Sequence, residues 1–219
     1  CHGESGTGGV GVPLALPGFQ SSVDDAYLRA TIRHGRPGRV MPAFARLSDA
    51  EVDALVVHIR SWRKDAAVPK FTSERIAGDA RKGAALFAQH CAACHGEQGQ
   101  GGRGTGVTFS RPRDLPIIAP ALNNPGFLVA ATDSQIKATL MHGREGTPMV
   151  SFIKQGLSEG EIDDLVSYVR SFGAADKTAQ PAAAADAEPA MLMMESPYTL
   201  EETVEAVKRA AVGKNFRLI

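Results

Sequence analysis

The sequence has few cysteines, few aromatic residues and no excess of charge of either sign. Only three of its 219 residues are cysteine, 6% are aromatic, and Lys plus Arg equals Asp plus Glu at 24 each. A formal net charge of zero, without blocks of like charge, argues against a nucleic-acid or other polyanionic partner. With 43% hydrophobic residues, the chain has enough apolar material for one or two globular cores.

Long apolar stretches are also lacking. A helix that crosses a bilayer needs about 18 or more apolar residues in succession, and the sequence has no such run. The first residues do not form a signal peptide, which has a charged start and an apolar middle, although a truncated start would hide one. The sequence therefore predicts no membrane span in this stretch. It contains no feature that indicates the oligomeric state.

All three cysteines lie in one type of motif. Residues 91–95 read CAACH, the C-x-x-C-H pattern of covalent c-type haem attachment. The opening residues 1–4, CHGE, match residues 94–97 of that segment. We therefore expect the chain to begin inside a first copy of the motif, with a further cysteine and a helix preceding it. No cysteine is left over for a structural disulfide.

A C-x-x-C pair also occurs in thioredoxin-like dithiols and in zinc sites. The dithiol motif needs a βαβ context, and zinc needs a second pair of ligands. Here a helix-like segment containing Gly83 and Phe87 precedes the motif, and a histidine follows it directly. The pattern favours haem, with thioethers through Cys91 and Cys94 and the imidazole of His95 on the iron.

An internal repeat organises the chain. Residues 17–44 align without a gap on residues 125–152, and after a two-residue insertion residues 47–62 align on residues 157–172. The later block begins in both copies with a serine and a glutamate three residues apart, the capping box of a helix start. Apolar residues follow at helical spacing. They are Val52, Leu55, Val56, Ile59 and Trp62 in the first unit and Ile162, Leu165, Val166, Val169 and Phe172 in the second. The repeat predicts two units of one all-α fold, each with one buried face on its last helix.

Met41 and Met149 are the only methionines that the repeat aligns. Each lies in a short loop before the capped helix, where a thioether can complete a His/Met ligand pair on a low-spin haem. Two alternatives remain for the second unit: Met149 as an ordinary core residue, and its neighbour Met141 as the ligand. Because Met141 aligns with Arg33, the repeat favours Met149.

Two histidines, His34 and His142, also align, and each precedes a glycine that is expected to end a helix. A histidine in a last helical turn interacts favourably with the free carbonyls there, which favours a structural role. A bis-histidine haem site is the alternative.

The second unit has a longer loop than the first. From the motif histidine to the aligned methionine there are 39 positions in the first unit (2 to 41) and 54 in the second (95 to 149). The additional residues are rich in glycine and proline and predict a surface loop. Its arginines Arg103, Arg111 and Arg113 could meet a haem propionate, but simple solvation is the favoured interpretation.

With these motifs, residues 1–64 and 78–173 resemble class I c-type cytochromes. The resemblance implies two tandem all-α domains joined by a connector at 65–77, each wrapped around one haem c, so that an intact protein carries two. It also implies a bacterial periplasmic or otherwise extracytoplasmic location, where the family completes haem attachment. The implied thioether residues are Cys1, Cys91 and Cys94, and the implied iron ligands are His2, Met41, His95 and Met149.

The remaining sequence differs in character. Residues 174–190 are rich in alanine and proline without periodicity, which is typical of a linker. Residues 191–219 resemble the beginning of a bacterial domain-of-unknown-function family, number 302, and predict a partial α+β segment. Its helix is expected to start at a capping box formed by Thr199 and Glu202 and to end at Gly213. Such a segment is too small to bury a core alone, so we expect it to be cut short.

These features predict an electron carrier and not an enzyme, since an iron with two protein ligands has no vacant position for a substrate. The expected partners are redox protein donors and acceptors of a periplasmic respiratory chain. One alternative is a di-haem oxidoreductase, such as a peroxidase or a sulfur-compound dehydrogenase, in which one iron is open. Another is an electron supply for the C-terminal segment.

Overall fold

The computed structural model describes residues 1–8, 11–63, 67–103 and 118–175, together with residues 199, 201, 202, 204 and 205. The chain divides into two compact units, Cys1–Ala179 and Gln180–Ile219. The first unit contains both copies of the sequence repeat. Its described regular elements are helices, apart from one pair of two-residue strands. The all-α prediction is confirmed for this unit.

The first copy of the repeat forms three helices: α1 (Pro17–Gln20), α2 (Asp25–His34) and α3 (Asp49–Ser61). The carboxylate of Asp24 caps α2 by accepting a hydrogen bond from the backbone of Tyr27. Ser48 and Glu51 form the predicted capping box at the start of α3, with both hydrogen bonds present. These side chains satisfy N–H groups that have no partner within the helix, which is why the helices begin at these residues.

The second copy adds two helices before the repeated ones. In chain order it contains α4 (Ala80–His90), α5 (Ala92–His95), β1 (Gly102–Arg103), β2 (Ile118–Ala119), α6 (Pro125–Ala130), α7 (Asp133–His142) and α8 (Glu159–Ala175). The strands β1 and β2 are antiparallel and close the base of the longer loop. Ser158 and Glu161 form the second capping box, again with both hydrogen bonds.

The repeat is equally visible in the turns that follow α2 and α7. Both helices end at a glycine with positive φ, Gly35 at 59° and Gly143 at 71°. A side chain is strained in this region of backbone conformation, so glycine is the residue that stops these helices. The predicted helix ends are thus confirmed in both copies.

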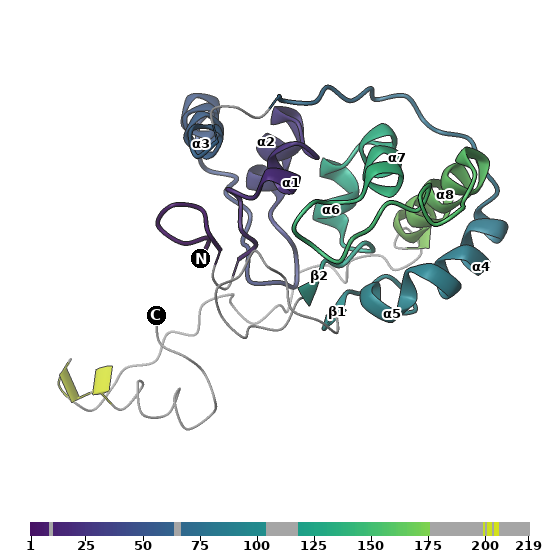
Figure 1. Ribbon diagram of the computed structural model, residues 1–219. Helices are drawn as coiled ribbons and strands as arrows, with labels where there is room; N and C mark the ends of the chain where they lie inside the picture. Colours follow the sequence, from purple (N-terminus) through teal and green to yellow (C-terminus); the bar gives the residue numbers. More distant parts are fainter. Residues whose placement is uncertain are drawn as a thin grey trace. The chain divides into compact units, whose positions relative to one another are not determined.

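The core of the second copy lies where α4 packs against α8 (Figure 1). Phe87 of α4 is 1% exposed, and its ring centroid lies 5.2 Å from that of Tyr168 and 5.6 Å from that of Phe172. Gly83 makes this approach possible, because a Cβ there would lie 2.0 Å from the carbonyl oxygen of Asp164. Close contact between the helices therefore depends on a glycine at this position.

For one residue of the first copy, the predicted burial is wrong. Leu55 was expected on the buried face of α3, but it is 40% exposed, whereas its repeat counterpart Leu165 is 1% exposed. In the second copy α4 covers that part of α8, and among the described residues no helix covers the same part of α3. The periodicity of a helix predicts its apolar face correctly, but burial also requires a neighbouring element.

The two copies contact each other through reciprocal elements. A Cβ on Gly126 of α6 would lie 2.2 Å from the carbonyl oxygen of Gly35, and one on Gly18 of α1 would lie 2.3 Å from that of Glu145. The short helix of each copy therefore rests on the loop that precedes the aligned methionine of the other copy. Figure 1 shows α2 next to α6 in this arrangement, and these two helices are in contact.

The second unit is described at only a few positions. Thr199 and Glu202 form the predicted capping box, with the Glu202 backbone donating to the Thr199 hydroxyl and the Glu202 carboxylate accepting from the Thr199 backbone. The rest of the predicted α+β segment at 191–219, including Gly213, lies outside the described residues, as does nearly all of the linker at 174–190. Among the helices that the structure describes, none is long and apolar enough to cross a membrane.

Candidate haem sites

The complete motif lies at the junction of α4 and α5. Cys91 is the residue that ends α4, and Cys94 and His95 belong to the single turn of α5. Gly96, with φ at 79°, ends that turn. The motif therefore begins at the end of α4 and continues into the single turn of α5. This arrangement brings two thiols and an imidazole together within five residues.

The ring of His95 is oriented by the backbone of the longer loop. Its Nδ1 lies 2.9 Å from the carbonyl oxygen of Pro120. Because a carbonyl oxygen only accepts, Nδ1 carries the proton, and the lone pair of Nε2 is left available for a metal ion. Burial lowers the pKa of His95, and the positive charge of Arg144 lowers this pKa further. The neutral form, which is the form that ligates a metal, is thus favoured.

The opening residues reproduce this arrangement. The Nδ1 of His2 lies 2.8 Å from the carbonyl oxygen of Val12, which is the repeat counterpart of Pro120. The backbone N–H of Gly8 donates to the carbonyl of His2 over 2.7 Å, as that of Gly101 does to His95. The first copy therefore holds its motif histidine in the same way as the second.

An aromatic side chain from the last helix covers each of these motif loops. A Cβ on Gly6 would lie 2.3 Å from the ring of Trp62, and one on Gly99 would lie 2.6 Å from the ring of Phe172. Trp62 and Phe172 are the aromatic residues that end the two apolar faces identified from the sequence. Each links the last helix of its copy to the loop that carries the motif.

The aligned methionines lie in loops held by a second repeated hydrogen bond. The backbone N–H of Arg36 donates to the carbonyl of Met41 over 2.9 Å, and that of Arg144 donates to the carbonyl of Met149 over 2.7 Å. Both methionine side chains are partly buried. The rival Met141 packs against the hydrophobic core, as its place in α7 requires.

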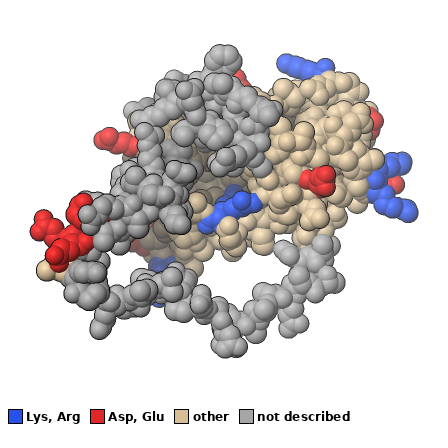
Figure 2. Space-filling view, turned by 90° about the horizontal axis from the view of Figure 1, so that it is seen from below, with Lys and Arg blue, Asp and Glu red and all other residues tan. Residues whose placement is uncertain are grey.

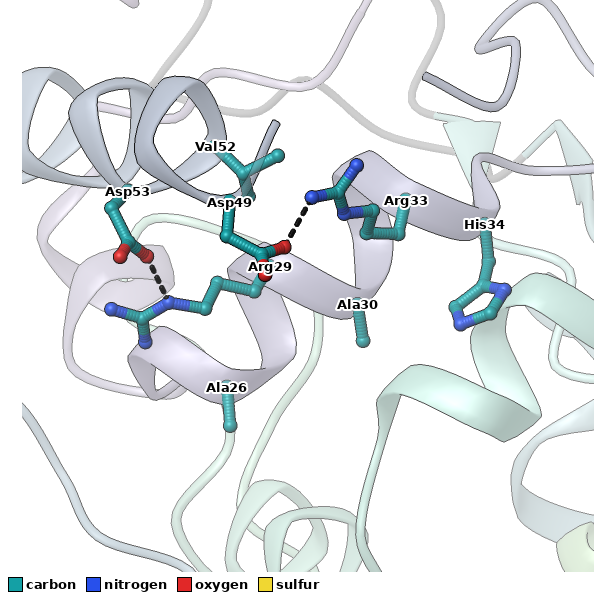
Figure 3. Close-up of a pocket in the computed structure, with 8 residues that line it drawn as sticks. All are labelled: Ala26, Arg29, Ala30, Arg33, His34, Asp49, Val52 and Asp53. Carbon is teal, nitrogen blue, oxygen red and sulfur yellow. Dashed lines mark hydrogen bonds and ion pairs between the residues drawn. The ribbon is translucent and has the colours of Figure 1, made fainter. Parts of the chain in front are cut away.

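The aligned histidines His34 and His142 are exposed at the ends of their helices. His142 and Met149 line one cavity of about 460 Å³. His34 lines a different cavity of about 520 Å³ between α2 and α3, shown in Figure 3. Ion pairs at the side of that cavity join the two helices, and the ring of His34 lies apart from them. They are Arg29 with Asp53 and Arg33 with Asp49.

The cysteines form no disulfide with one another, and their surroundings do not suit the two alternative motifs. Burial raises the pKa of the Cys91 thiol to about 12, with a smaller contribution from Cys94, so that this thiol is not poised as a redox nucleophile. A helix and not a strand precedes the pair, unlike in a βαβ dithiol protein. Within the described part of the chain, no group of three or more His, Cys, Asp or Glu residues could hold a metal ion, as a zinc site would require.

Two pairs of arginines at the site were not identified from the sequence. Arg60 and Arg170 align in the repeat, and each joins the last helix to the aspartate at the start of the helix before, Asp25 and Asp133. Arg36 and Arg144 align as well, directly after the glycine that stops α2 or α7. The alignment of Arg36 with Arg144 in the gapless part of the repeat was the sequence signal that could have identified this pair. The side chains of Arg103, Arg111 and Arg113 lie outside what the structure describes.

The residues present fit a haem in the second copy. Two thiols, a neutral imidazole with a free Nε2 and a methionine thioether are the donor set of a c-type haem with His/Met ligation. The buried Nε of Arg144 has no hydrogen-bond partner among the described residues, which is consistent with an anionic group of a cofactor nearby.

On the face shown in Figure 2, the described charged side chains carry both signs. This distribution agrees with the formal net charge of zero of the whole chain.

Comparisons with known proteins agree with this assignment. The cytochrome c family matches residues 80–173, and the family of subunit III of cbb3-type cytochrome c oxidase matches residues 1–59. The chain is 29% identical over 187 residues to the cbb3-type cytochrome c oxidase subunit CcoP of Azospirillum sp. strain B510, covering 79% of this chain and 57% of that protein. The chain thus spans little more than half the length of this relative.

Two further similarities are more limited. Over 93 residues the chain is 36% identical to the dihydro-heme d1 dehydrogenase of Pseudomonas aeruginosa, covering 42% of this chain and 15% of that protein. A chain of the reducing HAO-like protein complex of Kuenenia stuttgartiensis has the same fold, with a TM-score of 0.50 at 20% identity over 78% of this chain and 90% of that one. Residues 80–173 thus match the cytochrome c family and residues 1–59 match a cytochrome oxidase subunit family, and both matches support haem c as the cofactor and electron transfer as its chemistry.

Proposed function

We propose that the chain is a di-haem electron relay, in which each copy of the repeat binds one haem c with a histidine and a methionine on the iron. The proposed ligands are His2 and Met41 in the first domain and His95 and Met149 in the second. Cys91 and Cys94 are the proposed thioether residues of the second haem, and Cys1 is the proposed thioether residue of the first. The proposed domains are residues 1–64 and 78–173.

The observation that carries this proposal is the repeated orientation of the two motif histidines. In both copies a backbone carbonyl holds Nδ1, so that the same ring nitrogen, Nε2, is free for iron. In both copies an arginine backbone N–H also holds the carbonyl of the aligned methionine. Two sites with the same protein hydrogen bonds are expected to have the same ligation, since these hydrogen bonds fix the orientation of the ligands.

The residues of the chain have a supporting role in electron transfer. When bound, haem c supplies an iron that takes up and releases one electron. The protein would supply a histidine and a methionine to the iron and hold them in place, and the packing of Phe87 on Phe172 makes the helices beside the motif rigid. A rigid site of this kind lowers the structural change that accompanies each electron, and it leaves no position for a substrate.

We further propose that the chain works in the bacterial periplasm and delivers electrons to a respiratory enzyme. Several relatives that cover 79% of this chain are subunits of cbb3-type oxidases, which supports a terminal oxidase as the acceptor. The part of the dehydrogenase that this chain resembles covers a small fraction of that enzyme, so the similarity supports a shared electron-transfer domain.

Ligation can be tested on a protein whose first motif is completed by a second cysteine. The measurements are haem content, electron paramagnetic resonance and the near-infrared band of methionine bound to ferric haem. We expect two low-spin haems, with one methionine signature lost in Met41→Ala and the other in Met149→Ala. Met141→Leu is the matched control and should retain both signatures, since it exchanges one core residue for another of similar volume.

A different outcome would favour the oxidoreductase alternative. A high-spin haem in the unmodified protein, or rapid binding of cyanide or peroxide to one haem, would show an open iron and contradict the pure carrier. If the methionine signature is lost in Met141→Leu and retained in Met149→Ala, the ligand of the second haem is Met141 of α7 and not Met149 of the loop.

A further inference from the structure

Arg36 and Arg144 occupy the same position in the two copies but have different surroundings. The guanidinium of Arg36 donates to four acceptors of the protein, and it lies 5.7 Å from the ring centroid of Tyr27. Its acceptors are the carbonyls of Gly35 and Gly126, the hydroxyl of Tyr27 and the hydroxyl of Thr31, at 2.9 to 3.0 Å. Arg36 is therefore satisfied by protein groups alone, and one of its hydrogen bonds joins the two domains.

Among the described residues, no group accepts a hydrogen bond from the guanidinium of Arg144. Its Nε is buried without a partner, and no carboxylate of the described residues forms an ion pair with it. Burial lowers the pKa of Arg144, which means that its charge is poorly solvated. An arginine stays protonated in proteins, so this buried guanidinium needs hydrogen-bond acceptors, and an anion is the strongest acceptor.

The repeat also indicates why Arg144 lacks the hydrogen-bond acceptors that Arg36 has. Tyr27, which accepts a hydrogen bond from Arg36, has Gln135 as its counterpart in the second copy. Gln135 is 2% exposed, and its Oε1 has no hydrogen-bond partner among the described residues. Even if this amide oxygen reached Arg144, it would supply one acceptor, whereas the guanidinium of Arg36 has four.

The position of Arg144 limits where the missing anion lies. Its positive charge acts on the imidazole of His95, and its backbone N–H holds the carbonyl of Met149. Tyr27 of the first domain also interacts with it electrostatically. The hydroxyl of Tyr27 accepts from Arg36, so its own hydrogen remains available to a second acceptor. An anion bound to Arg144 would therefore lie beside the second haem site and close to the first domain.

We propose that Arg144 binds a propionate carboxylate of the haem attached at Cys91 and Cys94, and that it positions this haem against the first domain. The inference rests on the proposed ligation by His95 and Met149. A guanidinium holds a carboxylate through two parallel hydrogen bonds, which neutralises the carboxylate and fixes its direction. The same arginine of the repeat thus has two roles: Arg36 joins the domains, and Arg144 orients the second cofactor.

The test uses the haem-loaded protein and three variants, with two measurements on each. Resonance Raman spectroscopy follows the propionate deformation band, and a redox titration follows the midpoint potential of the second haem. Arg144→Gln should shift the propionate band and lower the midpoint potential, because the carboxylate loses its positive partner. Arg144→Lys should restore most of the potential while leaving the band shifted, since lysine supplies the charge without the bidentate geometry.

Arg36→Gln is the matched control. It should leave the propionate band and the potential of the second haem as in the unmodified protein, and it should lower the unfolding temperature. An unchanged band and an unchanged potential in Arg144→Gln would overturn the proposal. The same band shift in Gln135→Leu as in Arg144→Gln would also overturn it, because Arg144 would then act through the buried amide.

The outcome is separable from that of the ligation proposal. The near-infrared methionine band reports on Met149, whereas the propionate band reports on Arg144. If the unmodified protein has no methionine band, the ligation proposal fails, yet a propionate shift in Arg144→Gln would still support the role of this arginine.

Discussion

The carboxylate of Asp133, at the start of α7, lies 2.5 Å from the Nε of Arg170 in α8. The Asp133 side chain is 3% exposed, and it also accepts a hydrogen bond from the backbone of Ile76 over 2.9 Å. One buried carboxylate thus joins the last helix, the helix before it and the segment that leads into α4. The equivalent pair in the first domain, Arg60 with Asp25, has a 41% exposed carboxylate.

This difference in burial predicts different costs for the same change. Asp133→Ala should lower the free energy of unfolding by about 3–5 kcal/mol, because it leaves the Arg170 guanidinium partly buried without its counterion. Asp25→Ala should cost about 1 kcal/mol or less, since the Asp25 carboxylate is already solvated and Arg60, although as buried as Arg170, keeps its hydrogen bonds to Gln20 and Val23. Chemical denaturation of the haem-loaded protein measures both values. Equal costs for the two variants would contradict a role of burial in this pair.

A second prediction concerns the contact of α4 with α8. Gly83→Ala should lower the free energy of unfolding by about 1–3 kcal/mol, because the new methyl group meets the backbone of Asp164 and the helices must separate. Gly160→Ala is the matched control in α8, where a Cβ meets no atom within 4 Å. The control should raise the stability by about 0.5 kcal/mol, since alanine favours the helix. Thermal unfolding followed at the haem absorbance distinguishes the two, and a stabilising Gly83→Ala would refute the close packing.

A third prediction concerns the contact between the domains. Gly126→Ala places a methyl group against the carbonyl of Gly35, where the Cβ would be 2.2 Å from the oxygen. We expect the two domains to lose their mutual stabilisation and to unfold in two calorimetric transitions in place of one. Ala130→Ser, in the same short helix, serves as a control for changes within α6 itself. A single unchanged transition in Gly126→Ala would show that the domains do not depend on this contact.

A fourth prediction concerns acid stability. Hydrogen bonds from the backbone and the side chain of Ser158 lower the pKa of Glu161 in the folded chain. A carboxyl group with a lowered folded pKa contributes stability above its unfolded pKa, about 4.3, and this contribution is lost as the pH falls through the folded pKa. Glu161→Gln should therefore be less stable than the unmodified protein at neutral pH, with a difference that shrinks at about pH 3.

The control for this experiment is Glu74→Gln, which changes an exposed carboxyl group outside the capping boxes. Urea denaturation at both pH values gives the four stability differences that are needed. A stability difference for Glu161→Gln that is independent of pH would mean that the loss is one of hydrogen-bond geometry and not of charge.

Local features of the fold could be predicted from the sequence. The two capping boxes, the glycines that stop α2 and α7 and the apolar stripe of α8 all depend on residues within a few positions of each other. A serine and a glutamate three residues apart satisfy the first turn of a helix wherever that helix packs, so the pattern is sufficient. The repeat extended these predictions from one copy to the other.

Burial and pairing could not be predicted in the same way. Leu55 and Leu165 align, yet one is 40% and the other 1% exposed, because only α8 has α4 against it in the described part of the chain. The environments of Arg36 and Arg144 differ for a similar reason. One partner of Arg36 is the carbonyl of Gly126, 90 positions away, and no local pattern announces it.

The sequence by itself determined the haem motif, the two-copy organisation, the aligned methionines and the helices that carry them. These are statements about residue type and spacing, and covalent and helical geometry translate spacing directly into position. The tertiary structure decided which carbonyls orient the two motif histidines, how each copy rests on the methionine loop of the other, and which aligned arginine lacks hydrogen-bond acceptors among the described residues. These depend on contacts between segments distant in the chain, since a buried polar group is satisfied by whatever the folded chain places beside it.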